Sequence, residues 1–184
     1  MFRKTYWRSN LKRGWGVLTL VLILLVTAGI LIASAGESMT VSTRGDNIVH
    51  PNTMISSNLR FSPGPVTVAS GGTVTWVHAD DTEEPHTVSV VEQSDLGDTF
   101  EEVFACFNPG SICDQILTAH FTFGPVLDAF GPGNPAAPEF NEVGDSIFLE
   151  HGQSVEVTIT ADSGTSLYYL CAIHPWMQGV IQVK

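Results

Sequence analysis

The chain has 184 residues, enough for one domain with a sizeable hydrophobic core and some additional segments. It carries 19 acidic residues against 8 Lys and Arg, a formal net charge of −11. Five of the basic residues precede residue 14, and every acidic residue lies at Glu37 or beyond. The acidic part repels nucleic acid and favours basic protein partners. An equally good interpretation is that its charge only keeps an exported domain soluble.

An uncharged segment, residues 16–36, separates the basic and acidic parts. About 20 apolar residues span a bilayer, so this segment predicts a transmembrane anchor preceded by a basic cytoplasmic segment, residues 1–15. The alternative is a signal peptide cleaved near Ala35, which would leave a secreted or periplasmic domain. The anchor is favoured because signal-peptide apolar cores are usually shorter. Both alternatives predict an extracytoplasmic domain, and the anchor places it on the outer face of a prokaryotic cell membrane.

The three cysteines fit an oxidising compartment. Cys106 and Cys113 are separated by six residues in a loop-like region and can form a disulfide. Cys171 is then left unpaired. Metal ligation explains an unpaired cysteine in an exported protein, whereas a buried inert thiol or an intermolecular disulfide leaves its neighbours His174 and Met177 unexplained.

The first part of the exported region divides into a linker and the start of a β domain. Residues 37–54 are polar with little periodicity, which predicts a linker or a loosely attached first strand. The domain itself is expected over residues 55–184. Alternating apolar residues and turn signals predict its first strands. These strands cover residues 66–69, 73–77 and 86–91.

Residues 92–145 interrupt this pattern. The stretch 114–121 fits a short helix or a strand equally well, and residues 130–138 are rich in Pro and Gly. Loops of this length without clear elements are uncommon and are often functional or pinned. We interpret the segment as an insertion pinned by the expected disulfide.

Strand patterns return after the insertion. The turn at His151-Gly152 and the turn at residues 161–164 separate them. Short strands at this spacing are typical of a β-sandwich. The expected strands cover residues 146–149, 155–159, 166–170 and 179–183.

The last turn of the chain carries a metal-binding pattern, Cys171-x2-His174-x2-Met177. Thiolate, imidazole and thioether together suit copper, and a trigonal His2Cys site with a distant axial Met is the blue-copper arrangement. That arrangement needs a second histidine, and His86, after Pro85 at the start of an expected strand, is the best candidate.

These residues resemble the cupredoxins, the plastocyanin/azurin family of type 1 blue copper proteins. The resemblance covers about residues 55–91 and 146–184, and the short ligand loop is most similar to that of amicyanin. It rests on the following segments: Val66–Val68, Gly72–Trp76, Pro85–Val88, and Tyr169 with the run CAIHPWM followed by Gly179-Val180.

The resemblance implies an all-β, cupredoxin-like Greek-key β-sandwich that binds one type 1 copper ion. The implied ligands are His86, Cys171, His174 and Met177. The insertion departs from the family pattern, and Thr87 stands where many members carry Asn.

The expected function is single-electron transfer by Cu(II)/Cu(I) cycling, not catalysis. A binuclear copper centre needs two cysteines in the ligand loop, and a multicopper or nitrite-reducing enzyme needs further histidine ligands. The alternative is a copper carrier or chaperone, although no exposed Met or His tract is visible. The remaining histidines are interpreted as surface or structural: His50, His78, His120 and His151.

In the family, the second histidine ligand protrudes through an apolar patch where partners dock. By resemblance, Pro175 and Trp176 would form an exposed apolar rim around His174. A neighbouring loop would add acidic docking residues, namely Asp80, Asp81, Glu83 and Glu84. The expected partner is a redox protein such as a cytochrome, oxidase or dehydrogenase with a basic docking face.

Overall fold

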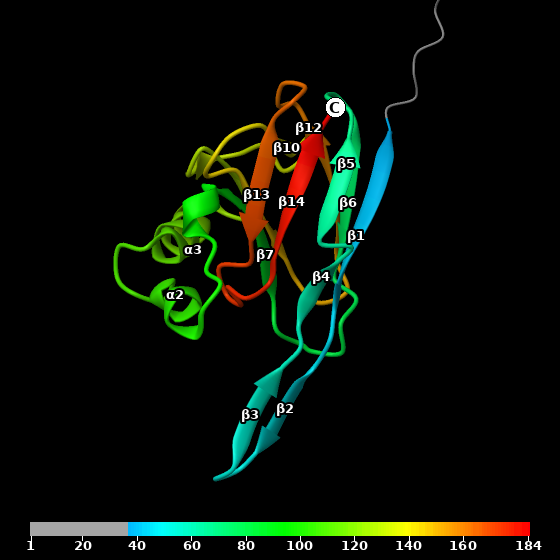
Figure 1. Ribbon diagram of the computed structural model, residues 1–184. Helices are drawn as coiled ribbons and strands as arrows, with labels where there is room; N and C mark the ends of the chain where they lie inside the picture. Colours follow the sequence, from blue (N-terminus) through cyan, green and yellow to red (C-terminus); the bar gives the residue numbers. More distant parts are fainter. Residues whose placement is uncertain (1–36) are drawn as a thin grey trace, which may run out of the picture. The chain divides into compact units, whose positions relative to one another are not determined.

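Two β-sheets packed face to face form the body of the domain (Figure 1). The structure is a computed structural model that describes residues 37–184. The predicted cytoplasmic segment and the anchor or signal peptide lie outside the described residues. Among residues 37–184, no helix is long and apolar enough to cross a membrane.

The first sheet has five strands in the order β10-β12-β6-β1-β4. The central strand β6 pairs in parallel with β1 and antiparallel with β12. Its strands are β1 Ser38–Arg44, β4 Arg60–Ser62, β6 Thr73–Val77, β10 Glu139–Phe140 and β12 Ser154–Ile159.

The second sheet has seven strands in the order β5-β14-β13-β7-β11-β8-β9. Strand β7 is buried along its whole length, between β13 and β11. The strands are β5 Pro65–Val68, β7 His86–Val91, β8 Val126–Asp128, β9 Gly131–Pro132, β11 Ser146–Leu149, β13 Ser166–Leu170 and β14 Gln178–Val183.

Residues 37–54, predicted as a linker or a loosely attached first strand, contain strand β1 and most of a hairpin. Strand β1 lies inside the first sheet, with Val41 and Thr43 buried and Ser42, between them, half-buried. Two of its three inward residues, Met39 and Val41, are apolar, and the third, Thr43, is polar. The chain then forms a hairpin of β2 (Asn47–His50) and β3 (Met54–Ser57), which projects beyond one end of the sandwich (Figure 1).

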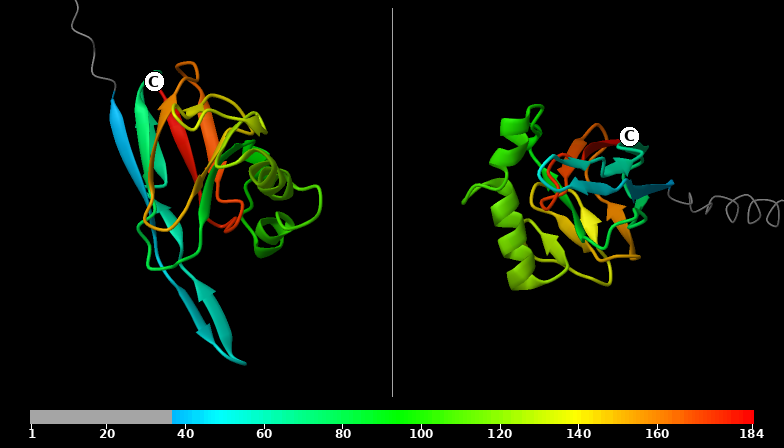
Figure 2. Two further views of the ribbon diagram at one scale, coloured as in Figure 1. Left: turned by 180° about the vertical axis from the view of Figure 1, so that it is seen from behind. Right: turned by 90° about the horizontal axis from the view of Figure 1, so that it is seen from below.

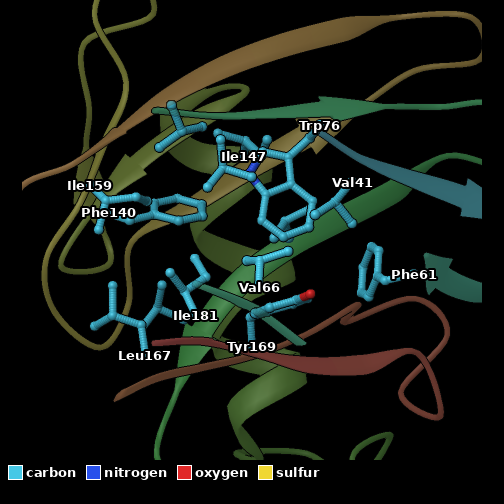
Figure 3. Close-up of a cluster of buried hydrophobic side chains, with 14 of the residues drawn as sticks. Val41, Phe61, Val66, Trp76, Phe140, Ile147, Ile159, Leu167, Tyr169 and Ile181 are labelled. Carbon is cyan, nitrogen blue, oxygen red and sulfur yellow. The ribbon is translucent and has the colours of Figure 1, made fainter. Parts of the chain in front are cut away.

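The hydrophobic core lies between the two sheets (Figure 3). Phe61 and Trp76 from the first sheet meet Tyr169 from the second in edge-to-face contacts, with ring centroids 5.2 and 4.9 Å from that of Tyr169. The Tyr169 hydroxyl donates to the carbonyl oxygen of Gly64. A Cβ atom at Gly179 would collide with the Tyr169 ring, so this position of β14 requires glycine.

The insertion supplies the two α-helices of the described chain, so the fold is mostly β rather than all-β. Helix α2 spans Phe100–Ala105 and α3 spans Ile112–Phe123, after a short 3-10 turn at Gln93–Asp95. Ser111 caps α3 by accepting from the N–H of Asp114. The expected disulfide between Cys106 and Cys113 is confirmed.

The helices cover one outer side of the sandwich (Figure 2). A second apolar cluster joins them to the sheet, where Ile116 of α3 packs with Leu170, Ala172 and Val91. The end of strand β13 and the two residues after it therefore alternate between two faces. Tyr169 and Cys171 belong to the main core, while Leu170 and Ala172 contact the insertion.

Candidate metal centre

The candidate ligands lie at one end of the sandwich, on two neighbouring elements of the second sheet. His86 is the first residue of β7, and the loop between β13 and β14 carries the other three. Two backbone hydrogen bonds close this loop. The Cys171 N–H donates to the Met177 carbonyl oxygen at 3.0 Å, and the Met177 N–H donates to the His174 carbonyl oxygen at 2.8 Å.

Three donor atoms converge at this end. The Cys171 Sγ lies 3.8 Å from Nδ1 of His86 and 3.8 Å from Nδ1 of His174, and the two nitrogens are 3.1 Å apart. In a triangle with these sides, the point equidistant from all three atoms lies about 2.1 Å from each, close to the roughly 2.0–2.3 Å of metal bonds to imidazole and thiolate. The donors therefore already stand at bonding distance from one common position.

Met177 completes the set that the sequence predicts. Its side chain is fully buried and belongs to the same core cluster as Cys171. Two imidazoles and a thiolate with a thioether nearby form the donor set that suits copper in a trigonal site with a weak axial ligand. The chemistry of the residues present fits a copper ion.

Backbone N–H groups surround the sulfur of Cys171. The N–H of Thr87 donates to Sγ at 3.3 Å and the N–H of His174 at 3.4 Å. Burial raises the pKa of the Cys171 thiol, and these hydrogen bonds oppose that shift. The thiol of the metal-free protein is thus neutral, and metal binding has to release its proton.

A buried carboxylate holds the outer nitrogen of His86. Nε2 of His86 lies 2.8 Å from Oδ2 of Asp80, and both side chains are fully shielded from solvent. Burial alone would raise the pKa of Asp80, but hydrogen bonds from Thr43 and Thr82 together with the charge of His86 hold it far below its usual range. Burial lowers the pKa of His86 to about 4, although Asp80 acts in the opposite direction.

This position of Asp80 corrects the sequence-based expectation. The residue was predicted to belong to an exposed acidic docking loop, but its side chain points inward and fixes the orientation of His86. A ligating histidine usually donates its second N–H to such a group, which sets its tautomer. Asp81 and Glu83 of the same loop are exposed, as expected.

A second carboxylate holds His174. Its Nε2 lies 2.8 Å from Oε2 of Glu84, whose side chain is 51% exposed. The amide of Asn47, on hairpin strand β2, donates to the same carboxylate oxygen at 2.9 Å. His174 itself is only 5% exposed. The expected protruding histidine is therefore a buried one, covered by Glu84.

The apolar rim also differs from the expectation. Pro175 is buried and Trp176 is partly exposed. The Trp176 ring lies 5.3 Å from the ring of His174 and stacks at 6.5 Å on Phe104 of α2. The insertion therefore supplies part of the apolar surface beside the metal site, a contact that sequence spacing does not indicate.

The other histidines lie in different settings. His50 and His151 are exposed, whereas His78 and His120 are buried. The Nε2 of His78 lies 3.4 Å from Oδ1 of Asp80. Sequence reasoning missed the carboxylates as histidine partners; the one available signal was an acidic loop that ends at a histidine ligand.

No family model matches the chain, and no curated protein matches it. Several solved structures are similar to it. Auracyanin from Roseiflexus castenholzii is 20% identical, over 80% of this chain and 96% of its own, with a TM-score of 0.45. Auracyanin A from Chloroflexus aurantiacus, a "blue" copper protein, is 20% identical over 80% and 100%, with a TM-score of 0.41. A purple cupredoxin from Nitrosopumilus maritimus is 16% identical over 79% and 99%, with a TM-score of 0.40.

Proposed function

We propose that the protein is a mononuclear type 1 copper protein that carries single electrons between redox partners. The observation that carries this proposal is the convergence of His86 Nδ1, Cys171 Sγ and His174 Nδ1 around one position at bonding distance. Met177 is the proposed axial ligand. The similarity of the ligand loop to that of amicyanin remains a prediction.

The chain's own residues support electron transfer because they hold the donors still. When bound, copper supplies the Cu(II)/Cu(I) couple. Strand β7 fixes His86, and the two backbone hydrogen bonds of the ligand loop fix Cys171 and Met177. A site that changes little between oxidation states transfers electrons rapidly, because little reorganisation is needed. The axial ligand and the hydrogen bonds to the Cys171 sulfur would set the reduction potential.

Burial supports a carrier over an enzyme. Three of the four proposed ligands are fully buried, and His174 is 5% exposed. A substrate would need an open coordination position that it could reach from solvent. An electron needs neither, and it can leave through the imidazole of His174 and the neighbouring ring of Trp176.

The proposed docking surface surrounds this exit. Ile55 of the hairpin, Phe100 and Phe104 of α2, and Trp176 line one cavity. Ile55 is 80% exposed and Phe100 is 69% exposed, and large apolar side chains grouped in this way are typical of interaction sites. Because acidic side chains adjoin the exit, the proposed partner is a cytochrome, oxidase or dehydrogenase with a basic docking face.

The proposed location is the extracytoplasmic face of a prokaryotic membrane, with residues 16–36 as the anchor. The disulfide between Cys106 and Cys113 supports an oxidising compartment.

Copper titration of the purified domain tests the proposal. One copper ion per chain, an intense blue colour with Cu(II) and a reversible one-electron wave are expected. Cys171→Ser should abolish the colour because it removes the thiolate-to-copper charge transfer. The Cys106→Ser/Cys113→Ser double variant is the matched control and should stay blue. Tight Cu(I) binding without a blue Cu(II) form or a reversible wave would instead indicate a copper carrier.

A further inference from the structure

A chain of two hydrogen bonds links the β2–β3 hairpin to a candidate ligand. The side-chain amide of Asn47, the first residue of β2, donates to Oε2 of Glu84 at 2.9 Å. The same oxygen lies 2.8 Å from Nε2 of His174, whose other ring nitrogen faces the metal position. A carboxylate oxygen only accepts, so the Asn47 NH2 group and the Nε2–H of His174 both donate to it. One acceptor atom therefore serves both the hairpin and the metal centre.

The hairpin itself has few other restraints. Its two strands pair with each other and, within residues 37–184, with no further strand (Figure 1). An isolated two-stranded hairpin is only marginally stable in water. Its large apolar side chains are exposed rather than packed in a core, namely Ile48, Val49, Met54 and Ile55. An element with so few buried contacts opens or bends at low cost in free energy.

The base of the hairpin is held more firmly than its arm. Asp46 and Asn58 join the two sides of the base, because the Asp46 N–H donates to Oδ1 of Asn58 at 2.6 Å and the Asn58 N–H donates to the Asp46 carbonyl oxygen at 3.2 Å. The loop that carries Glu84 is attached to this base, where the Asp81 N–H donates to the Gly45 carbonyl oxygen at 3.3 Å. A twist of the arm about the base would therefore turn the amide of β2 away from the carboxylate while the loop stays in place.

Sharing the oxygen weakens the bond from His174. The amide of Asn47 draws negative charge from Oε2 of Glu84, so this oxygen accepts less strongly from the imidazole. A carboxylate on the outer N–H makes a ligating imidazole more basic, and a more basic ligand favours Cu(II) over Cu(I). Loss of the Asn47 bond would therefore strengthen the bond between His174 and Glu84 and lower the reduction potential.

We propose that Asn47 is a positioning residue that couples the hairpin to the reduction potential of the copper site through Glu84 and His174. This inference rests on the proposed function, in which a redox partner docks beside Trp176. Ile55 of β3 and Trp176 line the same cavity, so an apolar segment of the partner that enters the cavity presses against the hairpin. By reciprocity, the Cu(I) protein keeps the hairpin bonded to Glu84 more often than the Cu(II) protein does.

The partner that this coupling serves is an oxidised redox protein that accepts an electron. Phe100 and Phe104 give the cavity apolar walls, and the exposed carboxylates of Asp98 and Glu84 lie at or near it. Such a surface fits an apolar patch flanked by Lys or Arg. One electron passes from Cu(I) to the partner, and no bond or proton is exchanged. Docking that releases the hairpin would lower the potential and so favour this transfer.

The test is the reduction potential of the copper-loaded protein, measured by cyclic voltammetry at low salt. Asn47→Leu removes the donor and should lower the potential by about 30 mV, which corresponds to a threefold change in the redox equilibrium. In a Glu84→Ala background the same substitution should change nothing, because the shared acceptor is gone. Asn47→Ala removes the same amide and serves if Asn47→Leu perturbs the hairpin. Ser56→Ala is the matched control, since it removes a polar group from β3 and leaves the Asn47–Glu84 bond intact.

Hydrogen exchange of the amides of residues 47–57 gives a second readout. Exchange should be up to threefold slower in the Cu(I) protein than in the Cu(II) protein, and Asn47→Leu should abolish this difference. An unchanged potential in Asn47→Leu, or an equal shift in the Glu84→Ala background, would overturn the inference while the blue centre stands. Equal exchange in the two oxidation states would also overturn it. A protein that forms no blue copper centre at all would refute the proposed function itself.

Discussion

Each candidate histidine ligand has a carboxylate on the ring nitrogen that faces away from the metal position. The two carboxylates differ in burial: Asp80 on His86 is shielded from solvent, and Glu84 on His174 is half exposed. A buried hydrogen bond acts at low dielectric and fixes geometry, whereas an exposed carboxylate acts mainly through its charge. The two residues should therefore control different properties of the site.

Asp80→Asn tests the buried carboxylate. The amide cannot match the charge-assisted bond to His86, so the ring orientation is less well fixed. We expect copper affinity to fall about 10- to 100-fold, measured by competition with a chelator. Asp81→Asn removes a charge from an exposed neighbour and should leave the affinity within about twofold, as expected for a screened surface charge. Equal losses in both variants would contradict a specific role for Asp80.

Glu84→Gln tests the exposed carboxylate. Its negative charge stabilises the more positive Cu(II) state, so its removal should raise the reduction potential. A threefold change in the redox equilibrium corresponds to roughly 30 mV for one electron, and we expect a shift of about that size at low salt. Glu83→Gln, which removes a neighbouring exposed charge with no bond to His174, should shift the potential less. Cyclic voltammetry of the three proteins measures both effects, and a lower potential in Glu84→Gln would contradict this role.

At the scale of elements, the insertion is a separate layer that packs on the outer side of the second sheet. Ile116 of α3 packs with Leu170 and Ala172, the two neighbours of the candidate ligand Cys171. The disulfide between Cys106 and Cys113 ties α2 to α3 within this layer. The ligand loop has its own backbone hydrogen bonds, so it should depend little on that link.

The Cys106→Ser/Cys113→Ser variant tests whether the ligand loop is independent of the disulfide in the helical layer. A disulfide that closes a loop of this size stabilises by about 2.5 kcal/mol on the chain-entropy estimate. We expect hydrogen exchange to accelerate in α2 and α3, while the amides of β7 and β13 stay protected. The visible spectrum of the copper form should not change. Loss of the blue colour would show that the helical layer holds the ligand loop in place.

The sequence predicted local features well because their signals are local. The motif from Cys171 to Met177 lies in one turn, and alternating residues marked most of the strands. Strand β1 was predicted only as an alternative to a linker, because one of its three inward positions, Thr43, is polar, and Met39 and Val41 are the apolar ones. Residues 114–121, which lie in helix α3, were left undecided between helix and strand because the stretch is short and apolar on more than one side.

The roles of Asp80 and Glu84 could not be predicted from their spacing. Each depends on contacts between elements distant in the sequence, such as the bond from Glu84 to His174. A carboxylate in a surface loop has many possible partners. Only the packing of the two sheets and the helical layer determines which of them meet.

At the scale of the whole molecule, the metal-free protein buries several ionisable groups that prefer to be neutral or paired. Burial lowers the pKa of His86 to about 4 and also lowers that of His120. Their values in the unfolded chain are about 6.5. Between these limits the unfolded state binds more protons than the folded state, so stability must fall as the pH falls through this range. The pKa of Asp80 is also lowered in the folded protein. This group therefore reduces the stability only when the pH falls below its unfolded-state pKa of about 3.9.

The free energy of unfolding of the metal-free protein should therefore decrease between pH 6.5 and 4. The lowered pKa of His86 alone corresponds to a loss of about 3 kcal/mol in the free energy of unfolding, at roughly 1.36 kcal/mol per pKa unit. Urea unfolding at half-unit pH steps measures the decrease. His50→Gln is the matched control, because His50 is exposed and its removal should leave the pH profile unchanged. The copper-loaded protein should keep its stability down to a lower pH than the metal-free protein, because a metal on Nδ1 of His86 prevents that nitrogen from binding a proton. A metal-free protein equally stable at pH 6.5 and pH 4 would show that His86 can be protonated without cost in the folded state.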